Sequence, residues 1–311
     1  MEYDEAAKAV PAFFGLGQMG AALAGRMADS GDLIVSDLSD TARDALQSRG
    51  ASAIAQVDDL PCQKRIVFCC LPTSRHVEDL LFGAHGLVTR LEAGSIVVDM
   101  TSGDPDMSIE IAKKLAGRAI AYADAPVSGG PQAANAGTIM IIVGSPAPLF
   151  STLEPMLLRI SSNVTRVGDI GAGHTLKLVN NLLAAGNRLL TFEAVGIAAH
   201  RGLDVARCIE VINKSSGRNN VTEVTFPRHI LTGNVAQNFA LALGHKDVGL
   251  ARKLLPAAME EIALAPKILQ IMEGALSEYG SDADVNDIIH LYERASGARI
   301  AGVARVDERT A

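Results

Sequence analysis

Three glycines within six residues follow a short apolar run near the start of the chain. The stretch from Phe13 reads FFGLGQMGAALAG, so it contains the pattern G-x-G-x-x-G. Between a strand and a helix, the first glycine of this pattern permits a tight turn, the second lets the backbone approach a pyrophosphate, and the third allows close helix packing. The helix N-terminus then offers amide groups to the phosphates. The pattern predicts a dinucleotide site formed by Gly15, Leu16, Gly17, Gln18, Met19 and Gly20.

An acidic residue, Asp37, ends the second apolar run, LIVSD. It lies about 20 residues after the glycine pattern, where a carboxylate can accept hydrogen bonds from the adenosine ribose hydroxyls. A carboxylate there would repel a 2′-phosphate, and Leu38 stands where an arginine could pair with one. These residues favour NAD, and the nearby Arg43 leaves NADP open as an alternative cofactor.

Short β-rich runs alternate with helical stretches over the first half of the chain, and the pattern becomes helical after Gly173. Strands are predicted at 11–17, 32–37, 65–72, 95–100, 119–126 and 138–145, and helices at 19–31, 39–50 and 104–117. Later helices are predicted at 174–202, 204–216, 245–262 and 266–280.

This alternation predicts an α/β fold with a Rossmann-type, doubly wound sheet and helices on both faces. We expect a dinucleotide-binding domain over 11–170 and an all-helical domain for substrate binding and oligomerisation over 171–300, joined by a long helix. The chain after Ile300 is expected to be loosely ordered.

Composition and charge argue against several classes of partner. The net charge is −7 without a long basic run, which disfavours nucleic acid and anionic membrane surfaces. Residues 1–10 carry three acids and are not typical of a signal peptide. Polar residues interrupt the long helix, so we do not expect a membrane span. The four cysteines lack metal-ligand spacing, so we expect no metal site and a cytoplasmic location.

Five motifs together resemble one family. The chain contains, in this order, GLGQMG, DMTSGDP, DAPVSGG, GAGHTLKLVNN and HKDVGLA. This order is similar to that of the β-hydroxyacid dehydrogenases, whose members include 3-hydroxyisobutyrate dehydrogenase and tartronate semialdehyde reductase. The resemblance runs from about Phe13 to about Arg294. It implies an NAD(P)-dependent oxidoreductase that acts on a small 3-hydroxy carboxylic acid.

The motif DAPVSGG offers hydrogen-bond donors at Ser128, Gly129 and Gly130. A hydroxyl and two unobstructed backbone amides suit a carboxylate. The resemblance implies that these residues bind the acid group of the substrate. On the residues alone, a glycine turn with Ser128 as a helix cap is an equal alternative.

The motif GAGHTLKLVNN places Lys177 four residues before Asn181, so both lie on one face of the predicted helix. A lysine can act as an acid or base if burial and the positive helix end lower its pKa. The resemblance makes Lys177 the catalytic lysine and Asn181 its substrate-positioning partner, with Asn180 assisting. The alternative is a solvated lysine, which the flanking apolar residues Leu176, Leu178 and Val179 disfavour.

Further site residues follow strands or lie in the helical half. Thr101 and Ser102 follow one predicted strand and Leu71 and Pro72 another, at the sheet edge where ligands of doubly wound sheets bind. The resemblance places Thr101 and Ser102 near nicotinamide and substrate, and Leu71 and Pro72 are expected to line the cofactor cleft.

In the helical half, the resemblance directs Lys246 toward the cofactor, and Arg218 and Asn219 toward the substrate. The alternatives are an exposed charge pair at Lys246 and Asp247, and a solvated turn over residues 215–220.

Two alternative enzymes are disfavoured. Phosphogluconate dehydrogenases carry a glutamate two helical turns after the lysine, where this chain has Ala184, and imine reductases usually replace the lysine that is present here as Lys177. An NADP-preferring semialdehyde reductase of the same family and a non-catalytic dinucleotide-binding protein are the other candidates. Retention of Lys177 and Ser128 favours an enzyme. The apolar helices and the resemblance indicate a homodimer or homotetramer.

Overall fold

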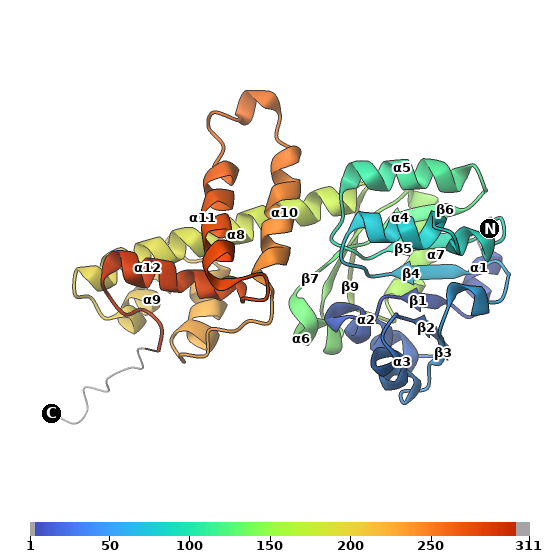
Figure 1. The fold of residues 1–311 in the computed structure, drawn as a ribbon, viewed down its shortest axis with the longest axis horizontal. Coiled ribbons are helices and arrows are strands. Elements are labelled where there is room, and N and C mark those ends of the chain that lie inside the picture. The colour runs from blue at the N-terminus through green and yellow to red at the C-terminus, as the bar shows by residue number, and fades with distance from the viewer. Residues whose placement is uncertain (1–3, 303–311) are drawn as a thin grey trace. The chain divides into compact units, whose positions relative to one another are not determined.

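The computed structural model describes residues 4–302, and the chain divides into two compact units. The division falls between Lys177 and Leu178, within one continuous helix, α8 (Ala172–His200). Figure 1 shows a sheet flanked by helices in the first unit and helices alone in the second. The predicted fold class is therefore confirmed. The assignment of 11–170 and 171–300 as functional domains stays a prediction.

The sheet of the first unit has nine strands in the order β3-β2-β1-β4-β5-β6-β8-β7, with β9 beside β8. Strands β1 to β6 pair in parallel. The strands are β1 (Ala12–Phe14), β2 (Ile34–Ser36), β3 (Ser52–Ile54), β4 (Ile66–Cys69), β5 (Ile96–Asp99), β6 (Ala121–Asp124), β7 (Val127–Ser128), β8 (Met140–Gly144) and β9 (Asn163–Gly168). The sequence patterns did not predict β3, β7 and β9, because these strands are very short or carry exposed polar residues.

Strand β8 runs antiparallel to β6 and β7 and parallel to β9. It begins at Met140 opposite Ser128, pairs Ile141 with Val127, and ends at Gly144, which forms the single pair with Asp124 of β6. The β7–β8 pair therefore extends beyond the carboxyl ends of the parallel strands.

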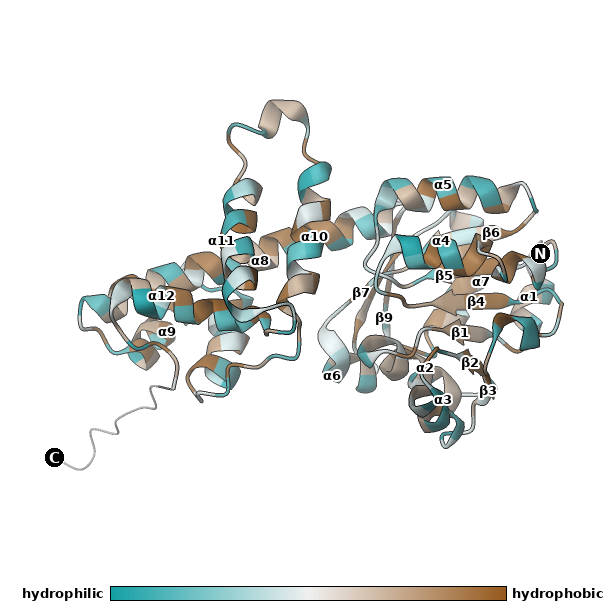
Figure 2. Ribbon diagram, in the orientation of Figure 1, coloured by the Kyte–Doolittle hydropathy of each residue, from teal (hydrophilic) through white to brown (hydrophobic). Residues whose placement is uncertain are grey.

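Alternate residues of the parallel strands fill two separate cores. Phe13 and Phe68 stack in one core, and Phe14 and Val67 belong to the other. Burying each such side chain contributes about 1.5–3 kcal/mol. Figure 2 shows hydrophobic residues along these strands.

Helices cover both faces of the sheet. Helices α2 and α7 pack on the Phe13 side, and α4 and α5 on the Phe14 side. The helices of this unit before α8 are α1 (Asp4–Lys8), α2 (Gln18–Asp29), α3 (Asp40–Gln47), α4 (Ser74–Phe82), α5 (Pro105–Ala116), α6 (Gly130–Asn135) and α7 (Ala147–Leu157).

The second unit packs helices around an aromatic cluster. The ring of Phe192 lies edge-on to Phe226 and Tyr292, with centroids 6.0 and 6.2 Å away. After α8 come α9 (Val205–Asn213), the π-helix η3 (Val221–Ile230), α10 (Leu241–Lys253), α11 (Ala265–Tyr279) and α12 (Ile289–Ser296). The predicted helix over 245–262 is wrong in its extent, because α10 begins earlier and ends before Pro256, which cannot continue a helix.

By length and composition alone, α8 could cross a membrane, since its best window has a mean hydropathy of 1.3. A helix in a protein core meets the same criterion. Helix α8 buries Ala185, Leu189, Phe192 and Val195 in the core of the second unit, and 39% of that window is buried.

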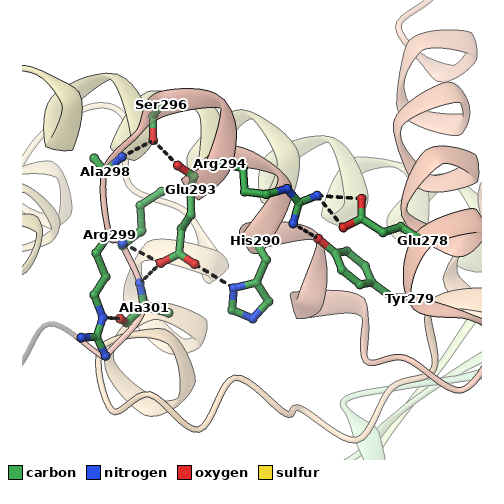
Figure 3. A network of polar contacts seen from close by, with 10 residues as sticks. Glu278, Tyr279, His290, Glu293, Arg294, Ser296, Ala298, Arg299 and Ala301 are labelled. Carbon is green, nitrogen blue, oxygen red and sulfur yellow. Dashed lines mark hydrogen bonds and ion pairs between the residues drawn. The ribbon is translucent and has the colours of Figure 1, made fainter.

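The last described residues are tied to α12 (Figure 3). Glu293 accepts hydrogen bonds from the amides of Ile300 and Ala301 at 2.7 and 2.8 Å, and it pairs with His290 at 2.7 Å. Ile300 and Ala301 are buried, and the rest of the tail predicted to be loosely ordered lies largely outside the described residues. A cavity of about 470 Å³ beside this network is lined by His290, Glu293, Arg294 and Arg299 among others, and by none of the motif residues.

Candidate active site

The three glycines of the first motif have different surroundings. A Cβ atom on Gly15 would lie 2.4 Å from Cys70 O, and one on Gly20 would lie 1.9 Å from Gly15 O. Gly15 also has a φ of +92°, which favours glycine. A Cβ on Gly17 would meet nothing within 4 Å. The first and third glycines are thus required by packing, whereas the second faces open space.

Helix α2 begins directly after Gly17, and no side chain caps its N-terminus. The first amide groups of a helix have no partner within the helix, and the helix dipole favours an anion there. The first turn of α2 contains no acidic residue that would oppose such binding. The glycine turn and the helix start therefore fit the pyrophosphate of a dinucleotide.

Asp37 lies beside this turn, at the end of β2. Its carboxylate accepts hydrogen bonds from Leu16 N at 2.5 Å and Ser39 N at 2.8 Å, and a carboxylate has capacity for more. The side chain of Leu38 is fully exposed. Arg43 donates to Asp37 O and pairs with Asp40, so one guanidinium does lie near the predicted ribose site.

A buried carboxylate and the threonine beside it connect the carboxyl ends of β4, β5 and β6. Asp99 is fully buried and accepts hydrogen bonds from Thr101 N and from the Tyr122 hydroxyl, both at 2.9 Å. Thr101 Oγ1 in turn accepts from Leu71 N at 3.1 Å. Burial raises the pKa of the Tyr122 hydroxyl well above its ordinary value, and Asp99 adds to the rise, so Tyr122 remains a donor.

These contacts bring Leu71 and Thr101 together. Leu71 also lies against Gly15, since a Cβ on that glycine would come within 2.7 Å of the leucine side chain. Pro72 and Ser102 lie in the same two turns, directly after Leu71 and Thr101. The structure thus gathers the predicted cofactor residues of three strand ends at one edge of the sheet.

The turn after β7 carries Ser128, Gly129 and Gly130. Gly129 and Gly130 have φ values of +138° and +77°, in the region that favours glycine. The N-cap of α6 is Gly129, without a side-chain capping bond, so Ser128 does not act as the helix cap considered above. A Cβ on Gly130 would meet nothing within 4 Å, and this open backbone suits a carboxylate ligand.

A second buried carboxylate anchors the start of α8. Asp124 is fully buried and accepts hydrogen bonds from Gly171 N at 2.7 Å and His174 N at 2.8 Å. Burial raises its pKa, while His174 and the two amides oppose that rise. A Cβ on Gly173 would lie 2.8 Å from this carboxylate, so only glycine fits there. Lys177, only 9% exposed, follows His174 on the same helix.

In the second unit, a third buried carboxylate orients Asn181. Asp247 is 2% exposed and accepts a hydrogen bond from Asn181 Nδ2 at 2.7 Å. Lys246 Nζ lies 3.2 Å from the other carboxylate oxygen, and Asn180 donates to Asn181 Oδ1 at 3.3 Å. His245 Nε2 lies 3.5 Å from Glu273 without hydrogen-bond geometry. The structure therefore groups Asn181, Lys246 and Asp247.

The polar turn before η3 is largely self-contained. Asn219 Oδ1 accepts from the amides of Val221 and Thr222, and its Nδ2 lies 3.2 Å from Thr191 Oγ1. Arg218 is exposed. Contact of Arg218 and Asn219 with substrate stays a prediction. Residues 4–302 contain no group of three or more His, Cys, Asp or Glu side chains that could hold a metal.

Comparisons with known proteins show the family to which the chain belongs. Residues 11–168 match the family model of the NAD binding domain of 6-phosphogluconate dehydrogenase, and residues 171–292 match that of NAD-binding of NADP-dependent 3-hydroxyisobutyrate dehydrogenase. The chain is 34% identical to 2-(hydroxymethyl)glutarate dehydrogenase of Eubacterium barkeri, with 93% of this chain and 97% of that protein covered. It is 32% identical to 3-hydroxyisobutyrate dehydrogenase of Pseudomonas aeruginosa, with 90% and 97% covered.

A solved structure of Psf3 in complex with NADP+ and 2-OPP is 26% identical to the chain, with a TM-score of 0.80 over 91% of this chain and 99% of that chain. Together, the fold, the glycine turn and these matches define an NAD(P)-dependent oxidoreductase that acts on 3-hydroxy acids. The chain belongs to the β-hydroxyacid dehydrogenase family.

Proposed function

We propose that the protein oxidises a small 3-hydroxy carboxylic acid with NAD as the preferred cofactor and Lys177 as general acid and base. One observation supports the proposal. Lys177 is buried in the first turns of α8, and Asp124 holds the start of that helix at the carboxyl edge of the sheet. The first unit carries the glycine turn on the same edge.

Each residue of the site has a step in the proposed reaction. The hydroxyl of Ser128 and the amides of the following glycine turn bind the substrate carboxylate. The glycine turn and Asp37 would hold NAD, which would supply the acceptor for the hydride of the carbinol carbon. The Lys177 amine takes the hydroxyl proton during oxidation, and in the reverse direction its ammonium returns the proton and stabilises negative charge on that oxygen.

Asn181 orients the substrate oxygen, and Asp247 fixes the orientation of Asn181. The carboxylate accepts one N–H of Asn181 Nδ2, and the Asn181 amide oxygen accepts from Asn180, so the second N–H of Nδ2 is the group proposed to donate to the substrate oxygen. Asn181 lies one helical turn after Lys177 on α8, so the two side chains share one face of that helix.

The names of the relatives narrow the substrate class. Similar proteins are named for 2-(hydroxymethyl)glutarate, 3-hydroxyisobutyrate and L-serine, each of which carries a primary alcohol on the carbon next to the one bearing the carboxylate. We propose a substrate with the same arrangement, resembling 3-hydroxyisobutyrate.

A panel of acids tests this function. Purified protein is incubated with NAD and, in turn, 3-hydroxyisobutyrate, 2-(hydroxymethyl)glutarate, L-serine and a 2-hydroxy acid, and NADH is followed by absorbance. We expect turnover with at least one 3-hydroxy acid and none with the 2-hydroxy acid. Binding of NAD without turnover of any acid would favour a dinucleotide-binding protein, and a clear preference for NADPH and a semialdehyde would favour the reductase.

The preference for NAD is expected to depend on Asp37. In Asp37→Asn, the amide oxygen can still accept from Leu16 N, but the charge that repels a 2′-phosphate is lost. We expect kcat/KM with NAD to fall by about tenfold or more, because a hydrogen bond to a charged group contributes roughly 1.5–3 kcal/mol, and the value with NADP to fall less or to rise. An unchanged ratio of the two values would contradict the ribose assignment.

We also propose that the chain forms a homodimer or homotetramer. Leu183, Leu190 and Ile197 recur every seven residues along α8 and are 63%, 65% and 61% exposed. An apolar stripe at this spacing suits packing against another helix. Light scattering of the purified protein measures its oligomeric state directly.

A further inference from the structure

The imidazole of His174 is completely buried where α8 begins. Its Nε2 lies 2.8 Å from Thr101 O, in the turn after β5, and its Nδ1 lies 2.7 Å from Ser108 Oγ, on α5. Its backbone amide donates to Asp124 at the end of β6. One residue therefore connects the start of α8 to three other elements.

The hydrogen bonds of the ring fix its orientation. The carbonyl of Thr101 can only accept, so Nε2 carries a proton. The hydroxyl of Ser108 lies 3.0 Å from Asp104 O, so it can donate to Nδ1 or accept from it while it donates to that carbonyl. Both ring nitrogens thus keep a partner whether His174 is neutral or charged.

The turn after β5 also packs directly on this ring. A Cβ on Gly103 would lie 2.8 Å from His174 Cε1 and 3.1 Å from Nδ1. Only a glycine lets the turn that carries Thr101 and Ser102 come so close. The ring is therefore a fixed support between the predicted nicotinamide turn and the helix that carries Lys177.

We propose that His174 is a positioning residue for the reaction. Lys177 is three residues further along α8, and residues three apart are neighbours on a helix surface. By holding the first turn of α8 against the Thr101 turn, His174 sets where the Lys177 amine lies relative to that turn. This inference rests on the proposed role of Lys177.

Three substitutions test the inference. His174→Leu keeps most of the buried volume but removes both ring hydrogen bonds, and we expect kcat to fall about 100-fold, because small misplacements of catalytic groups have effects of that order. The KM for NAD should change far less than kcat, since the glycine turn and Asp37 are untouched and only the turn carrying Thr101 loses a support. His174→Gln, whose amide nitrogen can reach Thr101 O, should recover most of kcat. His200→Leu is the matched control. His200 lies in the last turn of α8, and its Nδ1 also bonds a backbone carbonyl, that of Ser296 at the end of α12.

Hydrogen exchange of the peptide spanning residues 168–178 gives a readout independent of activity. We expect faster exchange in His174→Leu than in the wild type, and near-normal exchange in His174→Gln and His200→Leu. If His174→Leu does not fold, Ser108→Ala takes its place as the test. This variant keeps the imidazole and removes the partner of its Nδ1, so we expect an intermediate loss of kcat, smaller than that expected for His174→Leu.

The outcomes separate this inference from the proposed function. If Lys177→Ala keeps its activity, the proposed function fails, whatever His174 does. If Lys177→Ala is inactive while His174→Leu keeps wild-type kcat and exchange, the positioning role is overturned. A parallel loss of kcat and of NAD binding in both His174 variants would also overturn it, because it would indicate general loss of structure.

Discussion

Replacement of Lys177 by alanine is expected to lower kcat by about 10²- to 10⁴-fold, the usual contribution of a general acid or base. The side chain is buried near the start of α8, and no other lysine lies in the GAGHTLKLVNN motif that could replace it. NAD should bind with unchanged affinity, because the glycine turn and Asp37 lie in elements that Lys177 does not belong to. Lys177→Arg should also be inactive, since a guanidinium does not give up its proton near neutral pH.

The measurement is steady-state turnover with the best acid of the panel, together with a titration of NAD by fluorescence. Lys113→Ala is the matched control, because Lys113 is a solvent-exposed lysine on α5 that pairs only with a neighbouring exposed Glu110. Turnover close to wild type in Lys177→Ala would remove this residue from the mechanism, even if the fold and the cofactor assignment held.

Replacement of Gly17 by valine is expected to weaken NAD binding about 100-fold, equal to the loss of two hydrogen bonds to a charged group at roughly 1.5 kcal/mol each. A side chain at this position has free space in the protein itself, but it would occupy the place where a pyrophosphate approaches the start of α2. The melting temperature should therefore change little.

Gly20→Ala gives the opposite pattern. Its Cβ would collide with Gly15 O, so we expect a loss of about 1–3 kcal/mol or more in the free energy of unfolding, the typical cost of overpacking. Thermal unfolding and NAD titration of both variants separate the two effects. Tight NAD binding by Gly17→Val would contradict the placement of the pyrophosphate.

The local patterns of the sequence predicted the fold class and the central strands, and the residues predicted for the cofactor do lie at one edge of the sheet. A glycine turn, an acidic strand end and hydroxyl residues after a strand are features of consecutive residues, so their placement follows from the parallel topology. The structure adds the contacts between them, such as Leu16 N with Asp37 and Leu71 N with Thr101.

The buried carboxylates could not be predicted in the same way. Asp99 and Asp124 lie opposite each other on the adjacent strands β5 and β6. Asp99 accepts from the hydroxyl of Tyr122, and Asp124 accepts from the amide of Gly171, which is distant in sequence. Asp247 meets Asn181 across two helices of the second unit. The amino-acid types and spacings gave no signal for these pairings, because they depend on tertiary packing. The π-helix η3 was missed because its residues lack a regular 3.6 periodicity and include Pro227.

The reversed strand β8 has a consequence for substrate choice. Because β8 runs antiparallel to β7 and pairs Met140 with Ser128 beyond the end of β6, hydrogen-bond register sets how far the predicted carboxylate-binding turn stands from the ends of the parallel strands. A slip of a single position would turn Ser128 to the opposite side of the sheet. Under the proposed function, the pairing of β7 with β8 fixes the distance from the carboxylate-binding turn to the strand ends, so we expect an insertion or deletion in this pair to change the length of acid that the protein accepts.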